Sequence, residues 1–224
     1  MKLQLSNVTL VCIDCESIYR SIRVMEHCKE LCDFGDALFF TSEPTDYPHV
    51  KIESISDPDR VRGLVNYSLF VLTKLHEFIR TEFVLIVQHD GWVLHPDCWD
   101  RDWETLDYIG PRFLQDGRVG SGGFSFRSRK LMAEVARIMP PLRGWSFGNT
   151  GYAFEDGVIC CGLRNALMAQ GMRFADPDAA SRFAYGGYVQ DFQDRPFGFH
   201  GFYALDRLLG GTGENIVRAP DRNL

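Results

Sequence analysis

The sequence predicts an α/β fold with a mixed, mostly parallel sheet flanked by helices. Short apolar segments alternate with amphipathic helical patterns along the first half of the chain, and the segment FVLIV at 83–87 has no polar face. A strand that is apolar on both sides is typical of the centre of a parallel sheet. Polar side chains also follow each predicted strand, at the edge where α/β sheets bind ligands.

The first half is expected to alternate between strands and helices. Its expected elements, in chain order, are a strand at 8–14, a helix at 16–32, a strand at 36–42, an edge strand at 51–55, a helix at 59–81 and a strand at 83–90. The helices are predicted from apolar residues that recur every three or four positions, such as Ile18, Ile22 and Met25. Right-handed crossovers then bring the strand ends to one edge of the sheet.

The second half is expected to be less regular. Its expected elements are a strand and turn at 106–113, a glycine-rich turn at 120–123, a strand leading to a helix capped by Ser128 and stopped by Pro140, a helix at 155–170, a strand and loop at 173–184, and a short helix near the end. Glycines and aromatic residues are dense over 110–203, which is typical of loops that line a site.

Length and composition favour one globular domain. The 224 residues are 45% hydrophobic and 24% charged, which is ordinary for a soluble protein. The net charge of -6 argues against a groove that grips nucleic acid by charge alone. No apolar run approaches the ~20 residues of a membrane span. We therefore expect a cytoplasmic protein, with the inner membrane surface as an alternative, and reduced rather than zinc-binding cysteines.

Asp90 ends the predicted central strand and is followed by Gly91. A carboxylate there can reach Mg²⁺ or Mn²⁺, ions that take one or two protein carboxylates and leave other positions to phosphate and water. A plain turn is the alternative, since Asp-Gly is common in turns. His89 should point to the opposite side from Asp90. His200, in FGFHG, is either structural or a ligand, since imidazole suits Mn²⁺ beside a carboxylate.

Glu155 and Asp156 are adjacent carboxylates at a predicted helix start. The helix dipole alone explains an acidic first turn. The functional alternative is that one of them, whichever faces a cleft, takes a proton from an acceptor hydroxyl. The preceding segment NTGYAF, with Tyr152, suits a substrate-facing loop. Trp145, in a glycine-rich loop, is expected to contact an acceptor, whereas Trp103 is expected in the core.

The segment GSGGFSFRSRK at 120–130 combines glycines with three basic residues. Its glycines let a substrate approach the backbone closely. The basic residues Arg127, Arg129 and Lys130 can answer phosphate charge, although a glycine-rich bend followed by solvated charges explains the pattern as well. The segment matches neither the P-loop nor the dinucleotide-binding fingerprint.

Six segments form a combined pattern, which in chain order reads VQHDGWVLHPDCWD, YIGPRF, VGSGGFSFRSRKL, FEDGVICCGLR, RFADPDAASRFA and PFGFHG. In this order and spacing they resemble a bacterial and phage family of glycosyltransferase-like domains in the nucleotide-sugar-dependent GT-A superfamily. The resemblance implies one GT-A-like domain over 1–224, with a nucleotide-sugar-binding half at 1–91 and an acceptor half at 92–224. It implies sugar transfer from a UDP-, GDP- or dTDP-sugar to a glycan or other hydroxyl acceptor, with inversion, in surface polysaccharide or other glycan synthesis.

The resemblance also implies roles for single residues. Asp90 would bind the metal, Mn²⁺ or Mg²⁺, and the donor diphosphate, while Gln88 stands where a first carboxylate is usual. His200 would complete the metal shell, and Glu155 or Asp156 would act as the base. The residues expected to bind the donor are Asp14, Ser17, Thr41, Gln88, His89, Asp90, Gly122, Gly123 and Phe124, and those expected to bind the acceptor are Trp145 and Tyr152.

Two other functions stay open. A metal-dependent phosphoester hydrolase would need carboxylates shared between two metals, and only Asp90 is well placed for that. A catalytically inactive nucleotide-sugar-binding module is favoured by Gln88 in place of a carboxylate. The acidic net charge disfavours nucleic acid as a partner, with a modified base as the remaining possibility for a nucleic-acid acceptor.

Overall fold

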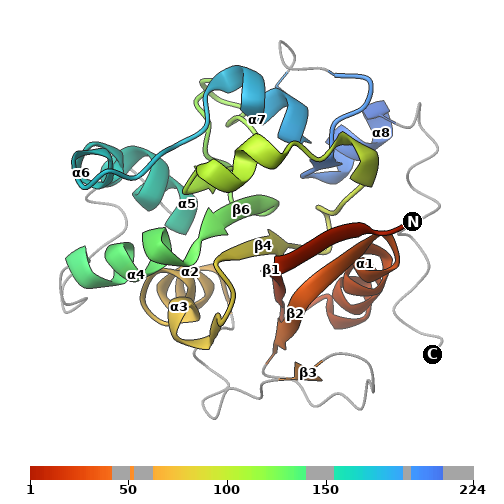
Figure 1. The fold of residues 1–224 in the computed structure, drawn as a ribbon, viewed down its shortest axis with the longest axis horizontal. Coiled ribbons are helices and arrows are strands. Elements are labelled where there is room, and N and C mark those ends of the chain that lie inside the picture. Colours follow the sequence, from red (N-terminus) through yellow and green to blue (C-terminus); the bar gives the residue numbers. More distant parts are fainter. Residues whose placement is uncertain (42–50, 53–62, 140–153, 189–192, 209–224) are drawn as a thin grey trace.

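A six-stranded sheet with the strand order β3-β2-β1-β4-β6-β5 forms the centre of the fold (Figure 1). The structure is a computed structural model, and it describes residues 1–41, 51–52, 63–139, 154–188 and 193–208. The strands are β1 (Leu3–Ile13), β2 (Cys32–Phe40), β3 (Lys51–Ile52), β4 (Phe83–Val87), β5 (Tyr108–Ile109) and β6 (Ser125–Ser128). The first four are parallel, and β6 runs antiparallel to both β4 and β5. The predicted α/β class with a mostly parallel sheet is confirmed.

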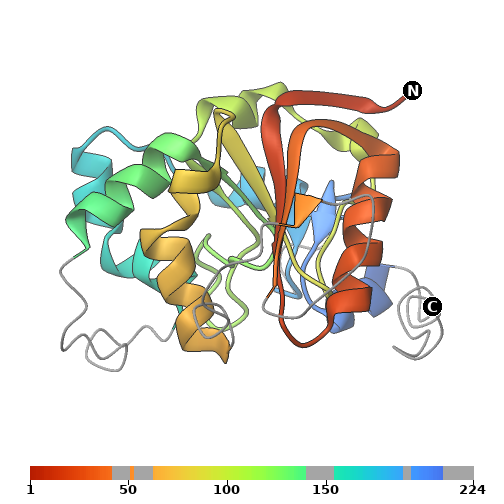
Figure 2. The same ribbon diagram turned by 90° about the horizontal axis from the view of Figure 1, so that it is seen from below.

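Helices cover both faces of this sheet (Figure 2). They are α1 (Ile18–Leu31), α2 (Gly63–Thr73), α3 (Leu75–Phe78), α4 (Arg129–Ile138), α5 (Glu155–Gly157), α6 (Arg164–Ala169), α7 (Pro177–Phe183) and α8 (Phe202–Leu208). Short 3-10 turns span Pro96–Cys98 and Arg101–Thr105. A second, two-stranded parallel sheet pairs β7 (Ala184–Tyr185) with β8 (Gly198–Phe199).

Side-chain alternation along β1 separates the two halves of the core. Leu10 and Cys12 pack with the buried face of α1, whereas Val11 and Ile13 pack with α2 and α3. The predicted core residue Trp103 is confirmed, since it is only 1% exposed. Because helices cover both faces of the sheet, a ligand can reach it only at the edge where the strands end. No described helix combines the length and apolar character needed to cross a bilayer.

Several predicted elements differ in extent. The predicted helix at 155–170 is interrupted, because residues Val158–Gly162 form a π turn closed by the Leu163 N–H on the Val158 carbonyl (2.8 Å). The predicted helix at 59–81 breaks between α2 and α3, and its first residues lie outside the described part of the chain. The central strand ends at Val87 rather than at 90, since the chain turns back at once.

The segment 173–184 was predicted as strand and loop, and this prediction is wrong for most of its length. It contains α7, whose first residue is Pro177 and whose N-cap is Asp176. The Asp176 carboxylate accepts the backbone N–H of Ala179 at 2.8 Å. Asp followed by Pro is a strong helix-start signal, since the side chain caps the first turn and proline needs no donor there. By contrast, the predicted cap of α4 is confirmed, because the Ser128 hydroxyl accepts the N–H of Leu131.

Candidate active site

Asp14 closes the carboxyl end of β1 in a compact turn. Its carboxylate accepts hydrogen bonds from the backbone N–H groups of Glu16 (2.7 Å) and Ser17 (2.8 Å) and from the Ser21 hydroxyl (2.6 Å). His89 Nδ1 lies 3.5 Å from Asp14 Oδ2. Burial alone would raise the pKa of Asp14, but hydrogen bonds from His89, Ser21 and the backbone lower it to about 2. The same contact with the ionised Asp14 raises the pKa of His89.

A tight turn follows β4 directly. Gln88 and Gly91 exchange two backbone hydrogen bonds of 3.2 and 3.0 Å, which leaves His89 and Asp90 at the tip. His89 and Asp90 were expected on opposite sides of a strand, but β4 ends at Val87 and both residues lie in the turn. The turn directs the His89 side chain toward Asp14 and the Asp90 side chain toward His200.

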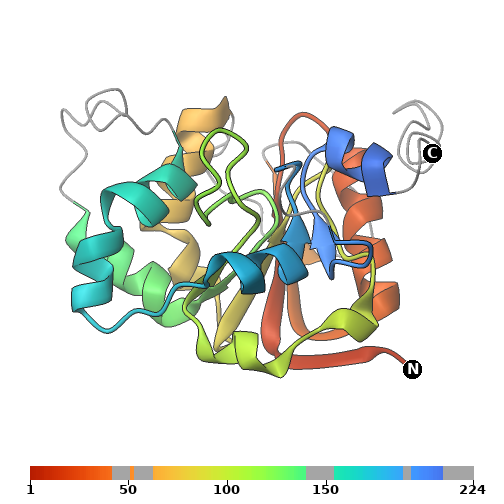
Figure 3. The ribbon, with the colours of Figure 1, turned by 90° about the horizontal axis from the view of Figure 1, so that it is seen from above.

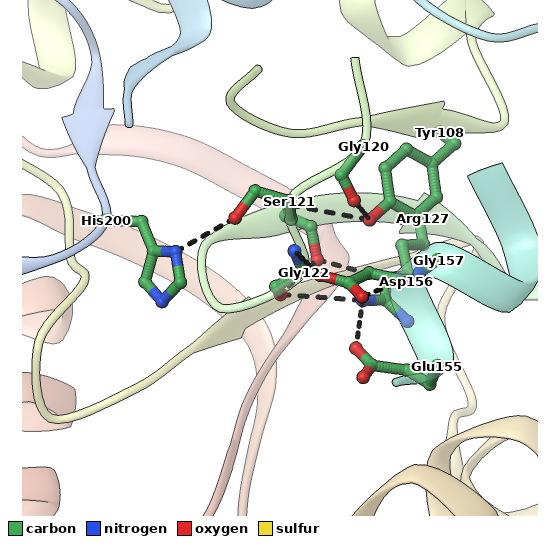
Figure 4. A network of polar contacts seen from close by, with 10 residues as sticks. Tyr108, Gly120, Ser121, Gly122, Arg127, Glu155, Asp156, Gly157 and His200 are labelled. Carbon is green, nitrogen blue, oxygen red and sulfur yellow. Dashed lines mark hydrogen bonds and ion pairs between the residues drawn. The ribbon is translucent and has the colours of Figure 1, made fainter. Parts of the chain in front are cut away.

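Asp90 faces His200, which comes from near the end of the described chain. Asp90 Oδ1 lies 3.7 Å from His200 Nε2. The backbone carbonyl of Asp90 also accepts the N–H of Gly201 at 2.7 Å, and the N–H of His200 donates to the Tyr185 carbonyl at 3.0 Å. The other ring nitrogen, Nδ1, lies 3.0 Å from the Ser121 hydroxyl (Figure 4). These contacts fix His200 on both sides of its ring.

The space between Asp90 and His200 has the chemistry of a cation site. Asp90 Oδ1 is buried, and no described residue forms a hydrogen bond with it. Burial lowers the pKa of His200, which favours the neutral ring. With Nδ1 on the Ser121 hydroxyl, Nε2 can direct its lone pair toward Asp90. A buried acceptor with no donor is costly unless a cation or water satisfies it.

Gly123 forms the floor under this pair. A Cβ at Gly123 would overlap Nε2 of His200 and would lie 2.5 Å from Oε1 of Gln88. An imidazole and an amide oxygen therefore converge on a residue that has no side chain, and the Asp90 carboxylate lies 3.7 Å from that imidazole. Together these three donor types suit Mn²⁺ or Mg²⁺. The described residues hold no cluster of three or more His, Cys, Asp or Glu side chains, so a cation here would draw further ligands from phosphate or water.

Glu155 is buried in an ion pair with Arg127. The carboxylate oxygen and guanidinium nitrogen are 2.9 Å apart, and the two side chains are 4% and 0% exposed. Arg127 also donates to the Ser125 hydroxyl at 3.0 Å, and its guanidinium lies 5.1 Å from the centre of the Tyr108 ring. The predictions that Arg127 answers phosphate charge or lies in a solvated run are wrong. Its charge is neutralised inside the protein by Glu155.

Arg127→Met is expected to destabilise the fold. The substitution would leave the Glu155 carboxylate buried without its counter-ion, which typically costs about 3–5 kcal/mol of unfolding free energy. Urea denaturation followed by circular dichroism measures this. Arg137→Met is the matched control, because Arg137 lies in an exposed pair with Glu134 and should change little. Equal stability of the two variants would show that the buried pair contributes nothing.

Asp156 has a different environment from its neighbour. Its Oδ2 accepts the backbone N–H of Gly122 at 2.9 Å, and its Oδ1 accepts the N–H of Gly157 at 2.6 Å (Figure 4). Burial, and then the negative charge of Glu155, raise the pKa of Asp156 to about 7. A carboxyl group that titrates near neutral pH can both take up and release a proton, which is the property required of a general base.

One cavity of about 430 Å³ brings Asp156 and His200 together. Residues of the loop between β5 and β6 line one side of this cavity, and residues near β7 and β8 line another. Figure 3 shows this loop next to β7 and β8. Ser121 and Tyr203 also line this cavity. Neither residue is predicted from the sequence pattern. Ser121 lies within the glycine-rich segment, but only the fold shows that its hydroxyl meets His200.

A larger cavity of about 650 Å³ lies at the other end of β4. It is lined by Glu82 and Phe83, where β4 begins, and by Arg129 and Lys130 at the start of α4. Since Asp90 follows the opposite end of β4, these two basic residues lie away from it. β6 carries the chain to the far edge before α4 begins, so a phosphate bound by Arg129 or Lys130 would lie in this cavity and not beside Asp90.

The remaining predicted ligand-binding residues have varied positions. Ser17 precedes α1, and Thr41, which is 2% exposed, follows β2. Phe124 is 0% exposed and fully buried in the core, so the structure does not present it to a ligand, contrary to its predicted role in donor binding. Trp145 and Tyr152, the two expected acceptor contacts, lie outside the described residues.

Comparison with known families gives one match over most of the chain. The family described as "Protein of unknown function (DUF5672)" matches residues 49–200. The chain belongs to the DUF5672 family. The matched part of this DUF5672 chain contains Asp90, Asp156 and His200, whereas β1 and Asp14 precede it. No curated protein matches the chain.

Solved structures give the DUF5672 chain distant similarities in fold. A glycosyltransferase involved in glycosylation of the major capsid of PBCV-1 is 15% identical, with a TM-score of 0.49 over 86% of this chain and 92% of the other. The mannosyltransferase PcManGT from Pyrobaculum calidifontis, in complex with GDP-Man and Mn²⁺, is 14% identical, with a TM-score of 0.46 over 78% and 55%. A protein assigned as a glucose-1-phosphate thymidylyltransferase from Bacillus anthracis, in complex with sucrose, is 7% identical, with a TM-score of 0.41 over 97% and 98%.

Proposed function

We propose that the DUF5672 chain is a nucleotide-sugar-dependent glycosyltransferase that transfers a sugar to a hydroxyl acceptor with inversion. One observation carries this proposal: Asp156, whose pKa is raised to about 7, lines the same cavity as His200, the partner of Asp90. A candidate base and a candidate phosphate–cation site thus share one space. Transfer from a sugar diphosphate needs both of these groups.

The donor is expected to bind where the parallel strands end. Asp90 and His200, with Gln88 beside them, would hold Mn²⁺ or Mg²⁺, and the ion would stabilise negative charge on the departing diphosphate. The hydrogen bond to the ionised Asp14 raises the pKa of His89, which favours the protonated imidazole at this end of the sheet, where a diphosphate would bind. The nucleoside would lie near Asp14, Ser17 and Thr41. Residues 1–91 would thus supply most of the donor half, and 92–224 would supply the acceptor half and add His200 to the cation site.

Asp156 accounts for the acceptor side of the reaction. In its ionised form it accepts the proton of the acceptor hydroxyl while that oxygen forms a bond to the anomeric carbon. The bond from that carbon to the diphosphate breaks on the opposite side, and the configuration inverts. A double-displacement route would need a second carboxylate as nucleophile. Glu155 is occupied by Arg127 at 2.9 Å, which favours the single, inverting displacement.

Gly123→Ala is expected to weaken Mn²⁺ binding by about tenfold or more, as disturbance of a ligand's orientation does in other metal sites. The new methyl group would overlap His200 Nε2 and crowd Gln88. Titration of free Mn²⁺ by electron paramagnetic resonance measures the affinity without any turnover. Gly171→Ala is the control, because its Cβ would meet nothing within 4 Å while its φ of +81° makes alanine strained. Gly171→Ala should therefore lower stability and leave Mn²⁺ affinity unchanged.

Calorimetry with UDP, GDP and dTDP, with and without Mn²⁺, tests the proposed function together with an assay for hydrolysis of the corresponding nucleotide-sugars. A transferase should bind one nucleotide more tightly with Mn²⁺ and release free sugar slowly when no acceptor is supplied. Binding without any turnover, even with acceptors present, would identify an inactive binding module. Release of phosphate from simple esters would identify a hydrolase.

A further inference from the structure

Three exposed apolar side chains gather around the cavity that contains Asp156. Tyr203 is 55% exposed, Leu114 is 51% exposed and Phe154 is 42% exposed, and all three line the cavity. Nine large apolar side chains are exposed among the described residues. Single exposed apolar residues are normal on protein surfaces, but several around one cavity indicate a surface that another molecule covers.

Backbone groups hold the flat ring of Tyr203 in place. Its hydroxyl donates to the Gly186 carbonyl at 3.0 Å. Its ring lies against Gly187 and Gly201, whose φ angles are +83° and +92°. A Cβ at Gly187 would overlap the ring, and one at Gly201 would lie 2.6 Å from its Cε1. The backbone therefore supports the ring at two points without any side chain in between.

Polar groups lie in the same cavity as this apolar surface. The Ser121 hydroxyl and the Asp156 carboxylate both line it, as do the side chains of Gln115 and Asp116 from the loop between β5 and β6. Binding sites for small molecules typically combine apolar and aromatic surface with a few placed polar groups. A ligand that fits this cavity has one flat apolar face and hydroxyl groups around its edge.

We propose that this cavity binds a sugar residue of the acceptor, with the C–H face of a pyranose ring packed on Tyr203. This inference rests on the proposed function, and it names the acceptor class as a carbohydrate. A pyranose has an apolar face of C–H bonds and a rim of hydroxyls. The C–H face gains dispersion contacts with an aromatic ring whose face is slightly negative. The rim can then bring one hydroxyl to Asp156.

The acceptor, rather than the donor, occupies this position because the two halves of the cavity differ in chemistry. At one end, His200 and its neighbour Asp90 would provide the ligands for a cation and its diphosphate. Beyond Asp156 the described cavity wall carries Leu114 and Phe154. Arg112 and Arg118 also line this wall, but both have partners within the protein: Arg118 pairs with Asp116 at 2.6 Å, and Arg112 lies 4.5 Å from the centre of the Tyr188 ring. A donor anchored at His200 would thus present its anomeric carbon toward Asp156, and the acceptor would approach from the apolar side.

Saturation-transfer NMR on the full chain tests the inference with methyl glycosides of glucose, galactose, mannose and N-acetylglucosamine as probes. We expect at least one glycoside to receive saturation, strongest at the C–H groups of one ring face. Tyr203→Leu keeps apolar volume but removes the flat surface, so it should weaken that binding by about tenfold. Tyr203→Phe keeps the ring on its glycines and should bind within a few fold of the parent protein.

Tyr19→Leu is the matched control, because Tyr19 is 48% exposed on α1 and does not line the cavity. Thermal unfolding checks that each variant is folded. The inference is overturned if no glycoside binds, if Tyr203→Leu binds as the parent does, or if uridine or guanosine displaces the glycoside. Hydrolysis of nucleotide-sugars should persist in Tyr19→Leu. If the parent protein binds no nucleotide-sugar, the proposed function is refuted, and this outcome is distinct from the result of the glycoside experiment.

Discussion

Asp156→Asn is expected to lower the rate of sugar transfer by about 10²- to 10⁴-fold, the usual contribution of a general base. The asparagine side chain cannot accept the hydroxyl proton, although its oxygen can still accept one backbone N–H from Gly122 or Gly157. Nucleotide-sugar binding should change little, because Asp90 and His200 are untouched. The measurement is a comparison of kcat with the dissociation constant of the nucleotide.

The pH dependence of the parent protein gives a second readout for the same residue. Since burial and Glu155 raise the pKa of Asp156 to about 7, the group is protonated and inactive as a base below that value. The rate of transfer should rise between about pH 6 and pH 8 and then level off. Asp178→Asn, an exposed acidic residue in the first turn of α7, should show the parental rate and profile. Full activity in Asp156→Asn, with an unchanged profile, would leave Asp156 only its structural contacts.

Asp90→Asn is expected to have the second large effect, on cation binding. Loss of residues that merely orient a metal ligand weakens affinity by about 10- to 100-fold, so loss of the ligand itself should weaken Mn²⁺ binding by at least about 100-fold. The Mn²⁺-dependent gain in nucleotide affinity should disappear. The fold should survive, because Asp90 Oδ1 has no hydrogen bond to lose among the described residues.

Calorimetry of nucleotide binding with and without Mn²⁺, together with thermal unfolding, separates these effects. Asp97→Asn is a suitable control, since Asp97 lies in an exposed pair with Arg195. If Asp90→Asn retains the full Mn²⁺-dependent gain, then Asp90 is a turn residue and the cation site lies elsewhere.

The fold class followed from the sequence because it depends on local pattern. The apolar run of β4 and the helical spacing of α1 are properties of short segments. The position of Asp90 at the end of a strand could be predicted for the same reason. The missed helix α7 carried a usable signal in Asp176-Pro177, whereas the π turn after α5 did not, because VICCG has the composition of an ordinary buried helix.

The sequence could not show that Glu155 and Asp156 have different roles. Both are carboxylates at one helix start. Glu155 differs because it pairs with Arg127, which lies far away in the sequence in β6. Only the pairing of β4 with β6 brings Arg127 beneath the helix start. The role of the Tyr203 ring was missed for a similar reason. The ring is supported by Gly187 and Gly201, and only the fold shows that these two glycines contact it.

The position of His200 directly after β8 has a consequence for synthesis of the protein. Asp90 and Asp156 are both made before His200, and the backbone N–H of His200 is held by Tyr185 of β7. A growing chain on the ribosome therefore cannot join His200 to Asp90 until the residues of β8 and His200 have emerged. Under the proposed function, a chain that has not reached this point would lack a ligand of the cation and would consume no nucleotide-sugar.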